Sequence, residues 1–314
     1  MEGKKSPKFK QTGSKEPRQN QRSLERQQKE EKYELTYAYK SFDELVEAGE
    51  YNFYGVVYDA SFPVEEFNAA ILPGQKEPLH KYTCVLKLID QSTNCLTNPK
   101  DLQEKMITLI VKANDKKNMP FVQKIGDIIR VHRGVYAPKK KRNVYLNLLK
   151  GSQFKGSWCL FSSESGDDPI QCSHEKFTFE SQDKTIIDST RTWIKNYFGI
   201  ENSLSYLQQT TLSQRSAEGA GNDLLVHIVK KIKLDDQLVF FIQDETDGCE
   251  LHTYKYFDYL NEDDIIRIRS FKVFDNDVLL LGEHGNIEVV PKFSKLHKNF
   301  VAKLIKKLKE LENK

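Results

Sequence analysis

The sequence lacks the features that mark secreted proteins, membrane-spanning proteins and several classes of enzyme. Its five cysteines are an odd number without a C-x-x-C pair, which fits a reducing compartment better than a disulfide framework. The polar N-terminus has no apolar signal core, and no apolar run approaches the roughly 18 residues of a membrane span. P-loop, nucleophile-elbow, zinc-protease and dinucleotide-binding patterns are absent too. We therefore expect an intracellular, non-enzymatic protein with no cofactor.

Metal-binding patterns are weak as well. Cys172 and His174 form a lone C-x-H without a second pair, so no zinc site is expected. The acidic pairs Asp167-Asp168 and Asp263-Asp264 fit a turn and the start of a strand. A metal-dependent nuclease built on Asp263 and Asp264 remains as an alternative to a pure binding protein.

Charge is unevenly distributed along the 314 residues. Residues 1–32 carry ten Lys or Arg against five acids, which leaves 38 basic and 40 acidic groups in the rest. The segment 1–32 is almost devoid of apolar residues, so we predict a disordered basic tail. It is either a solvated tail, a nuclear-import signal or an auxiliary DNA-binding arm. The remainder has no domain-wide positive field, so any nucleic-acid binding there depends on local basic groups.

Short β segments fill residues 33–182, with polar turns between them. Five strands with a short helix after the third, expected at 120–124, are typical of the OB-fold, a small Greek-key barrel that binds oligonucleotides. The predicted strands are Tyr51–Ala60, Tyr82–Asp90, Met106–Val111, Asp127–Tyr136, Asn143–Lys150 and Ser157–Ser162.

Residues 183–222 differ in pattern from the strands on either side. Apolar spacing over 183–198 predicts a helix with Asp183 as its N-cap, followed by a polar loop. A second OB-fold is predicted over 223–293 and an amphipathic helix over 294–314. The second set of strands is Asp223–Ile232, Leu238–Asp244, Cys249–Tyr254, Asp264–Phe274 and Val278–Leu281.

Two internal repeats relate the two sets of strands. The run Asp127–Arg133 (DIIRVHR) recurs as Asp264–Ser270 (DIIRIRS), and Leu88–Ser92 is echoed by Phe241–Thr246 in the same order. Two echoes in one order favour a duplicated barrel. The predicted fold class is therefore mainly β, with two tandem OB-fold barrels, a connecting helix and a C-terminal helix.

Binding chemistry for a single strand is present in the first barrel. Aromatic rings stack on bases, and cations hold the backbone phosphates. Burial in the barrel is the competing role for each aromatic ring. Lys139, Lys140, Lys141 and Arg142 form a basic loop that is either a DNA contact, a solvated hairpin tip or a nuclear-import signal. The candidates are Tyr54, Tyr58, Phe62, His132, Arg133, Tyr136 and Phe154.

The chain resembles the alpha subunit of the telomere end-binding protein and the related protection-of-telomeres proteins. The resemblance runs from about Tyr51 to about Leu304 and is most specific at Phe53–Pro63 (FYGVVYDASFP) and Gly126–Arg133 (GDIIRVHR). Ser157–Phe161, Trp193 and Ile266–Ser270 support it. It implies a nuclear protein at the telomere, which binds and caps the G-rich single-stranded 3′ overhang with two OB-folds.

The same resemblance implies particular DNA contacts. In the first barrel it points to Ser61, Phe62, Arg133, Tyr136 and Phe154. In the second it points to Phe274, Asp275 and His284, and the carboxylate of Asp275 suits the donor edge of guanine.

The chain also departs from the family pattern. Lys112 stands where many members have an aromatic residue, and no third OB-fold follows the second. In the family a partner subunit docks on sequence beyond the DNA-binding pair, so the chain is either a piece or works without that partner. Generic single-stranded DNA binding, or RNA binding of the replication or telomerase type, is the alternative function.

Overall fold

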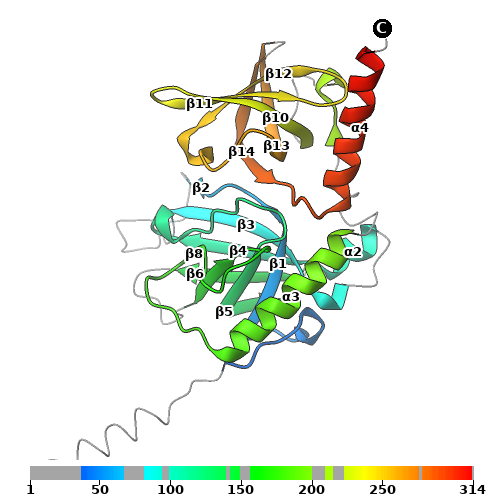
Figure 1. Ribbon diagram of the computed structural model, residues 1–314. Helices are drawn as coiled ribbons and strands as arrows, with labels where there is room; N and C mark the ends of the chain where they lie inside the picture. Colours follow the sequence, from blue (N-terminus) through cyan, green and yellow to red (C-terminus); the bar gives the residue numbers. More distant parts are fainter. Residues whose placement is uncertain are drawn as a thin grey trace, which may run out of the picture. The chain divides into compact units, whose positions relative to one another are not determined.

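The computed structural model describes residues 37–66, 81–93, 99–138, 142–148, 156–199, 209–214, 223–275 and 278–312. The chain divides into two units, Met1–Ala38 and Tyr39–Lys314, and the named helices and strands all lie in the second (Figure 1). The tail predicted over residues 1–32 lies outside the described residues. The architecture is mainly β, with two closed five-stranded barrels, a connecting helix α3 (Ser181–Gly199) and a last helix α4 (Lys295–Glu312), which confirms the predicted fold class.

The first barrel closes by pairing its first strand with its fourth. Its strands follow the order β1-β3-β4-β6-β5, and β5 pairs back onto β1. Every pair in this ring is antiparallel except β4–β6, which is parallel. The strands are β1 (Gly49–Ala60), β3 (Tyr82–Ile89), β4 (Ile107–Ala113), β5 (Ile128–Ala137) and β6 (Asn143–Leu148), with β2 (Val64–Glu65) beside β3 and β7 (Ser157–Phe161) and β8 (Gln171–Cys172) beyond β5.

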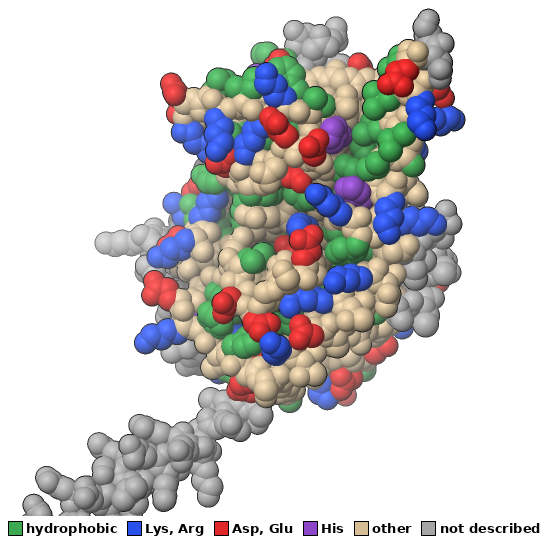
Figure 2. Space-filling view, viewed as in Figure 1, with side chains coloured by type: hydrophobic (Ala, Val, Ile, Leu, Met, Phe, Trp, Pro, Cys, Tyr) green, Lys and Arg blue, Asp and Glu red, His purple; other side chains and the backbone are tan. Residues whose placement is uncertain are grey.

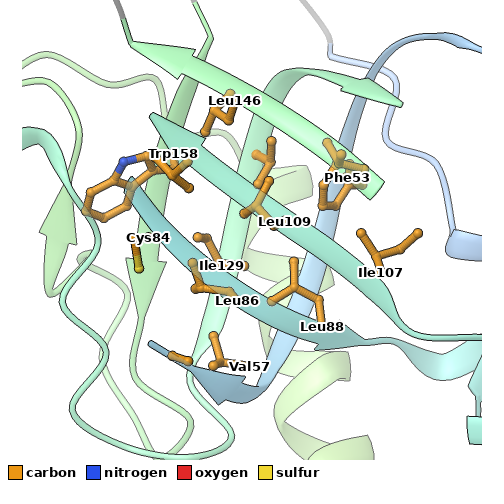
Figure 3. Packing of buried hydrophobic residues seen from close by; sticks show 14 of the residues in the cluster. Phe53, Val57, Cys84, Leu86, Leu88, Ile107, Leu109, Ile129, Leu146 and Trp158 are labelled. Carbon is orange, nitrogen blue, oxygen red and sulfur yellow. The ribbon is translucent and has the colours of Figure 1, made fainter. Parts of the chain in front are cut away.

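Alternating side chains fill this barrel. On β4, Ile107, Leu109 and Val111 are fully buried while the residues between them are partly exposed. Figure 3 shows Leu109 in the interior together with Leu86 and other side chains from the neighbouring strands. Each such burial stabilises the barrel by about 1.5–3 kcal/mol.

The helix after the third strand differs from the prediction. We expected it at 120–124, but the structure has a single 3-10 turn, η3 (Lys116–Asn118), capped by Asp115, which accepts the Lys117 N–H at 3.1 Å. Pro120 gives the reason, because proline forces the residue before it into an extended conformation, and Met119 is extended (ψ 141°). A second helix, α2 (Pro99–Lys105), lies before β4 and was not predicted.

The second barrel repeats the first strand for strand. Its order is β10-β11-β12-β14-β13, β13 closes onto β10, and β12–β14 is again the parallel pair. A 3-10 turn, η5 (Lys255–Phe257), again lies between the third and fourth strands. The strands are β10 (Asp223–Lys233), β11 (Gln237–Gln243), β12 (Gly248–Tyr254), β13 (Ile265–Asp275) and β14 (Val278–Val289), with β9 (Gln209–Thr210) beside β10.

The last strand of this barrel is longer than predicted. We expected it to end at Leu281, but β14 continues to Val289 through a glycine-containing stretch that resembles a turn. At Gly285 a Cβ would lie 2.7 Å from the Ser270 carbonyl oxygen and 2.8 Å from that of Arg269. Glycine therefore lets β14 approach β13 closely, as glycines in strands often do.

The repeated run starts the fourth strand of both barrels with the same geometry. Gly126 and Asp263, one residue before the repeats, both have left-handed backbones (φ 95° and 68°). The Gly126 N–H donates to the carbonyl of Val57 at 2.8 Å, and the Asp263 N–H donates to that of Ile228 at 2.9 Å. Seven residues further along, Arg133 (φ 57°) and Ser270 (φ 55°) are again both left-handed. The duplication inferred from the sequence thus extends to backbone conformation.

The second repeat marks an identical anchor at the end of the second strand. Asp90 and Asp244 each accept a hydroxyl two residues on, from Ser92 at 2.5 Å and from Thr246 at 2.6 Å. Their other carboxylate oxygens accept the N–H of a buried residue in a 3-10 turn, Phe42 of η1 (Phe42–Glu44) at 2.6 Å and Leu212 of η4 (Leu212–Gln214) at 2.7 Å. Each aspartate therefore ties the segment before its barrel to the barrel wall.

Helix α3 begins slightly before its predicted start. Asp183 is in its first turn rather than at the N-cap, and its carboxylate accepts the Glu180 N–H at 2.8 Å. The same carboxylate accepts the hydroxyls of Tyr39 at 2.7 Å and Tyr54 at 2.6 Å, and it lies 3.1 Å from the guanidinium of Arg130. A ring nitrogen of His132 lies 2.9 Å from the Tyr39 hydroxyl. Tyr54 and His132, which we predicted to contact DNA, therefore belong to the hydrogen-bond network that holds α3 against the first barrel.

Buried charges join the two barrels directly. Arg267 of β13 is 1% exposed and lies 2.9 Å from Asp59 of β1, and it also pairs with Glu288 of its own barrel. Arg269 reaches the same Asp59 at 2.5 Å. Burial raises the pKa of Glu288 to about 7. A backbone bridge between Lys124 and Val289 adds a second connection.

Candidate nucleic-acid interface

Three pockets follow one another across the two barrels. The first, of about 510 Å³, is lined by Trp158, Met119 and Phe62 of the first barrel and by Tyr256 of the second. A second, of about 410 Å³, shares Phe62 and continues to Tyr254 of the second barrel. A third, of about 510 Å³, shares Tyr254 and reaches His252. Because neighbouring pockets share lining residues, they form one line, which we call the pocket line.

Aromatic rings crowd the point where the pocket line crosses between the barrels. The ring of Phe62 lies 5.3 Å from that of Phe121, 5.7 Å from that of Tyr256 and 5.8 Å from that of Phe257. Lys116 places its ammonium 4.2 Å from the Tyr256 ring centre and 4.9 Å from that of Phe62, a cation–π arrangement.

Equivalent elements of the two barrels supply this contact. Lys116 comes from η3 and Tyr256 from η5, the 3-10 turns between the third and fourth strands. Duplication therefore brings two copies of one turn together, one carrying a cation and the other an exposed ring. No local sequence pattern signals the pair, because it forms only when the barrels dock.

The second barrel exposes the rings that remain accessible. Tyr254 is 64% exposed, Tyr256 55% and Phe274 75%. Tyr254 ends β12 and lines the second and third pockets, whereas Tyr256 lies in η5 and lines the first. Our prediction missed both tyrosines, because no local sequence pattern distinguishes them from the rings of the core. Phe274 was predicted, and its exposure leaves its ring free to stack.

Besides Tyr54 and His132, two further predicted contacts lie inside the protein. Tyr58 is 0% exposed, with its ring 6.2 Å from that of Phe198 on α3. Tyr136 is 4% exposed and packs edge-on against Tyr51 at 6.3 Å. A buried ring offers no face to a base, so the structure argues against both as DNA contacts, and the competing role of core packing explains them.

Three other predicted residues have structural partners. Arg142 donates to the carbonyls of Phe42 and of Lys105, the latter at 2.9 Å, so its guanidinium ties β6 to the preceding segments. The hydroxyl of Ser61 accepts the Val85 N–H at 2.9 Å. Arg133 is exposed, and its backbone N–H donates to the side-chain oxygen of Asn52 at 3.0 Å.

Several predicted contacts cannot be placed. Lys139, Lys140, Lys141 and Phe154 lie outside the described residues, as do the side chains of Asp275 and His284 within their strands. These residues stay predictions from the sequence. Phe62 is the predicted first-barrel residue that the structure places on the pocket line.

The surface charge agrees with the even balance of the sequence. On the face shown in Figure 2, Lys and Arg side chains are interspersed with Asp and Glu rather than gathered into one positive field. Lysines do lie on the pocket line, where Lys116 and Lys117 line the first pocket and Lys272 the second. The geometry thus combines exposed rings with a few local cations, which is how single strands are held.

The described residues offer neither a metal-ligand cluster nor a membrane-spanning helix. No group of three or more His, Cys, Asp or Glu side chains is placed there to hold a metal ion. Asp264 accepts the Asn261 N–H at 2.8 Å, which agrees with a strand-start role for the acidic pair. Within the same residues, no helix has the length and apolar character to cross a membrane.

Sequence relatives support the resemblance seen in the motifs. A telomere-binding protein homolog of Euplotes crassus is 31% identical over 293 residues, which is 85% of this chain and 58% of that protein. The alpha subunit of the Stylonychia mytilus telomere-binding protein is 28% identical over 286 residues, 83% of this chain and 54% of that protein. The chain therefore spans somewhat more than half the length of these relatives.

The chain is also similar to a solved structure and to a protein-family model. The crystal structure of fission yeast Pot1 with single-stranded DNA covers 84% of this chain and 92% of its own, at 12% identity and a TM-score of 0.35. Residues 14–204 match the family described as "Telomeric single stranded DNA binding POT1/CDC13". That match covers well over half of the 314 residues, so the chain belongs to the POT1/CDC13 family of telomeric single-stranded DNA-binding proteins.

Proposed function

We propose that this chain binds a single strand of telomeric DNA along the pocket line and so caps the G-rich 3′ overhang. The observation that carries the proposal is the continuity of the three pockets from the first barrel onto the second. Phe62 lines both the first and the second pocket, and Tyr254 lines both the second and the third. A strand laid along them contacts both barrels at once, and only a flexible, unpaired strand can follow such a path.

Base stacking supplies most of the binding energy in this proposal. On the pocket line, Tyr254 and Tyr256 expose 64% and 55% of their surface. Phe274 is 75% exposed but lines none of the three pockets, so its contact stays a prediction from the sequence. Each base stacked on a ring contributes about 1–3 kcal/mol. Because the folded part is nearly neutral, stacking outweighs long-range electrostatics.

Phosphates are held by the few lysines of the pocket line. Lys272 is exposed and lines the second pocket beside Phe62 and Tyr254. Lys117 is exposed at the first pocket. Affinity should therefore fall with salt, with a slope of roughly 0.7 per phosphate neutralised on a single strand.

Family membership supports a non-enzymatic role at chromosome ends. The relatives are named telomere-binding proteins, so we propose telomeric DNA and not single-stranded DNA of any sequence as the ligand. We place the protein in the nucleus at the telomere for the same reason. A partner subunit would dock on sequence beyond the DNA-binding pair, and this chain spans 54% and 58% of those relatives.

The ligand class is tested by fluorescence anisotropy with four probes at two salt concentrations. The probes are a G-rich telomeric strand, its complement, the duplex of both and the RNA version of the G-rich strand. We expect the G-rich DNA strand to bind most tightly. Equal affinity for the complement would point to a generic single-strand binder, and preference for RNA to a telomerase-type role.

The pocket line is tested with single substitutions. Tyr254→Ala and Tyr256→Ala should each weaken binding by about 1–3 kcal/mol, since each removes one stacking ring. Lys272→Ala should lower the salt slope by about 0.7. Phe177→Ala, at a ring 42% exposed and away from the three pockets, and Lys195→Ala on α3 are matched controls. Equal losses at the control positions would place the DNA elsewhere.

A further inference from the structure

Two cysteine thiols meet at the edge of the first barrel. Cys159 of β7 and Cys172 of β8 are direct partners across antiparallel strands, and their Sγ atoms lie 3.2 Å apart. Cys159 is 3% exposed and Cys172 is half-buried. The spacing of 13 residues gave no sign of the pair in the sequence, where the cysteines looked scattered.

The backbone between these residues suits a disulfide. The Ser173 N–H donates to the Trp158 carbonyl at 3.0 Å, which makes the flanking position the hydrogen-bonded one. Cys159 and Cys172 therefore occupy a non-hydrogen-bonded position, where Cα atoms approach to about 4.5 Å and side chains are closest. That separation lies within the roughly 4.4–6.8 Å range of disulfides, so a bond can form without strand movement.

One of the two thiols can be reached from the pocket line. Cys172 lines the first pocket together with Phe62, Trp158 and Tyr256. A small oxidant in that pocket reaches Cys172, whereas Cys159 lies beneath it against the guanidinium of Arg130 at 3.4 Å. Burial raises the pKa of Cys172 to about 12, so the reactive thiolate is scarce at neutral pH and the reaction is slow.

The strand that carries Cys172 also positions a ring of the interface. Gln171, its neighbour in β8, receives the Phe121 N–H at 3.0 Å and donates to the Phe121 carbonyl at 2.7 Å. Phe121 in turn packs edge-on against Phe62. A covalent bond between β7 and β8 would therefore stiffen the wall that supports Phe62.

We propose that Cys159 and Cys172 form a redox-sensitive dithiol, which peroxide converts to a disulfide and which a ligand in the first pocket shields. The Cys172 thiol loses its proton and its thiolate attacks one oxygen of hydrogen peroxide. The O–O bond breaks, the sulfur keeps that oxygen as a sulfenic acid, and the departing hydroxide takes up the thiol proton as one water. The Cys159 sulfur then attacks that sulfur and expels a second water as the S–S bond forms. Two thiols are oxidised by two electrons and one peroxide is reduced to two waters. The shielding rests on the proposed function.

The dithiol is tested without DNA. The protein is treated with excess hydrogen peroxide, quenched, denatured, alkylated and digested, and the peptides are identified by mass spectrometry. We expect the peptides of Cys159 and Cys172 to appear linked, and the melting temperature to rise by roughly 5 °C. In Cys172→Ser no link and no rise should occur. Both thiols remaining alkylated, or Cys172 ending as a sulfinic acid without the link, would overturn the dithiol.

Shielding is tested by repeating the oxidation with the G-rich strand, with binding measured in the same sample. At about 100 times its Kd, roughly one protein in a hundred is free, so the link should form at least about tenfold more slowly. If DNA binds and the rate is unchanged, shielding is wrong while the proposed function stands. If DNA does not bind, shielding fails with the proposed function, and the DNA-free result still decides the dithiol.

Discussion

The two barrels share a frame but use the same residue in opposite ways. The fourth strand of each carries a buried arginine at the same place in the repeated run, Arg130 and Arg267. Arg130 pairs with Asp183 and so holds the connecting helix against its own barrel. Arg267 pairs with Asp59 of the other barrel. Each barrel therefore contains one buried arginine at the equivalent position. Its carboxylate partner determines whether the arginine holds a helix against the barrel or joins the two barrels.

Aromatic residues are divided between the barrels in the same uneven way. In the first barrel Tyr58 and Tyr136 are 0% and 4% exposed, whereas Tyr254 and Phe274 of the second are 64% and 75% exposed. In the first barrel α3 packs over Tyr58 on the outer surface, whereas Tyr136 packs with the barrel interior. The second presents its rings to solvent, so we infer that it provides most of the stacking surface for DNA.

The largest test of this comparison is to remove the charge that joins the barrels. Arg267→Met leaves Glu288 buried without its cation, and Asp59 keeps only Arg269. A buried ion pair broken on one side costs about 3–5 kcal/mol. We expect that loss in the free energy of unfolding measured by urea denaturation.

Two variants complete that experiment. Arg267→Met combined with Glu288→Gln should recover part of the loss, because the uncompensated carboxylate is gone. Arg130→Met should cost less, since Asp183 still accepts from Tyr39, Tyr54 and the Glu180 N–H. Equal losses for the two arginines would contradict the different roles assigned to them.

A pH-dependent effect is expected at the aspartate that opens the repeated run. Asp127 is 2% exposed, whereas its counterpart Asp264 is half-exposed. Burial raises the pKa of Asp127 to about 7, although its carboxylate accepts the Ser163 N–H at 3.1 Å. The folded state then binds more protons than the unfolded state between about pH 4 and 7, so ionisation of Asp127 destabilises the fold as pH rises through that window.

Asp127→Asn keeps the shape of the side chain and removes this titration. Relative to wild type, the variant should gain about 1.4 kcal/mol per pH unit across the window and then level off above pH 7. Urea denaturation at pH 5, 6, 7 and 8 measures the difference. A constant difference between the two proteins over this range would show that Asp127 does not titrate there.

Strand order and duplication were predictable because they depend on local chemistry. Asp90 and Asp244 each accept the N–H of the residue two positions later in the chain. Each repeated run likewise follows a turn made by residues next to it in the sequence, so a short segment carries the whole signal. The burial of Tyr58 was not predictable in this way. All of the last eight residues of β1 are buried, because α3 covers the outer face while the barrel covers the inner one. The alternation of buried and exposed side chains, which would distinguish the two faces of β1, is therefore absent.

The contact between Lys116 and Tyr256 was also beyond the sequence. The two residues are far apart in the chain, and each lies in a short turn with no pattern of its own. Only the docking of the two barrels brings them together. Phe62 was found because the family motif marks it, whereas the exposed Tyr254 and Tyr256 needed the structure to separate them from core rings.

The smallest effect is expected where the two barrels use different residues for one turn. Gly126→Ala places a Cβ at a left-handed φ of 95° and 3.2 Å from the Phe198 ring, so it should destabilise the protein by more than about 1 kcal/mol. Asp263→Gly relieves the same conformation in the second barrel, but glycine adds entropy to the unfolded chain. We expect these terms nearly to cancel, with a change within about 0.5 kcal/mol.

Thermal unfolding of both variants decides how closely the turns correspond. A clear loss in Asp263→Gly would mean that the aspartate side chain itself holds the turn, and its carboxylate lies 3.4 Å from the ring nitrogen of His227. Asp263→Asn separates the cases, because it tolerates a left-handed backbone but carries no charge. A neutral Asp263→Asn together with a destabilising Asp263→Gly would show that a side-chain contact stabilises the left-handed turn in the second barrel. In the first barrel the same conformation depends on the backbone freedom of Gly126.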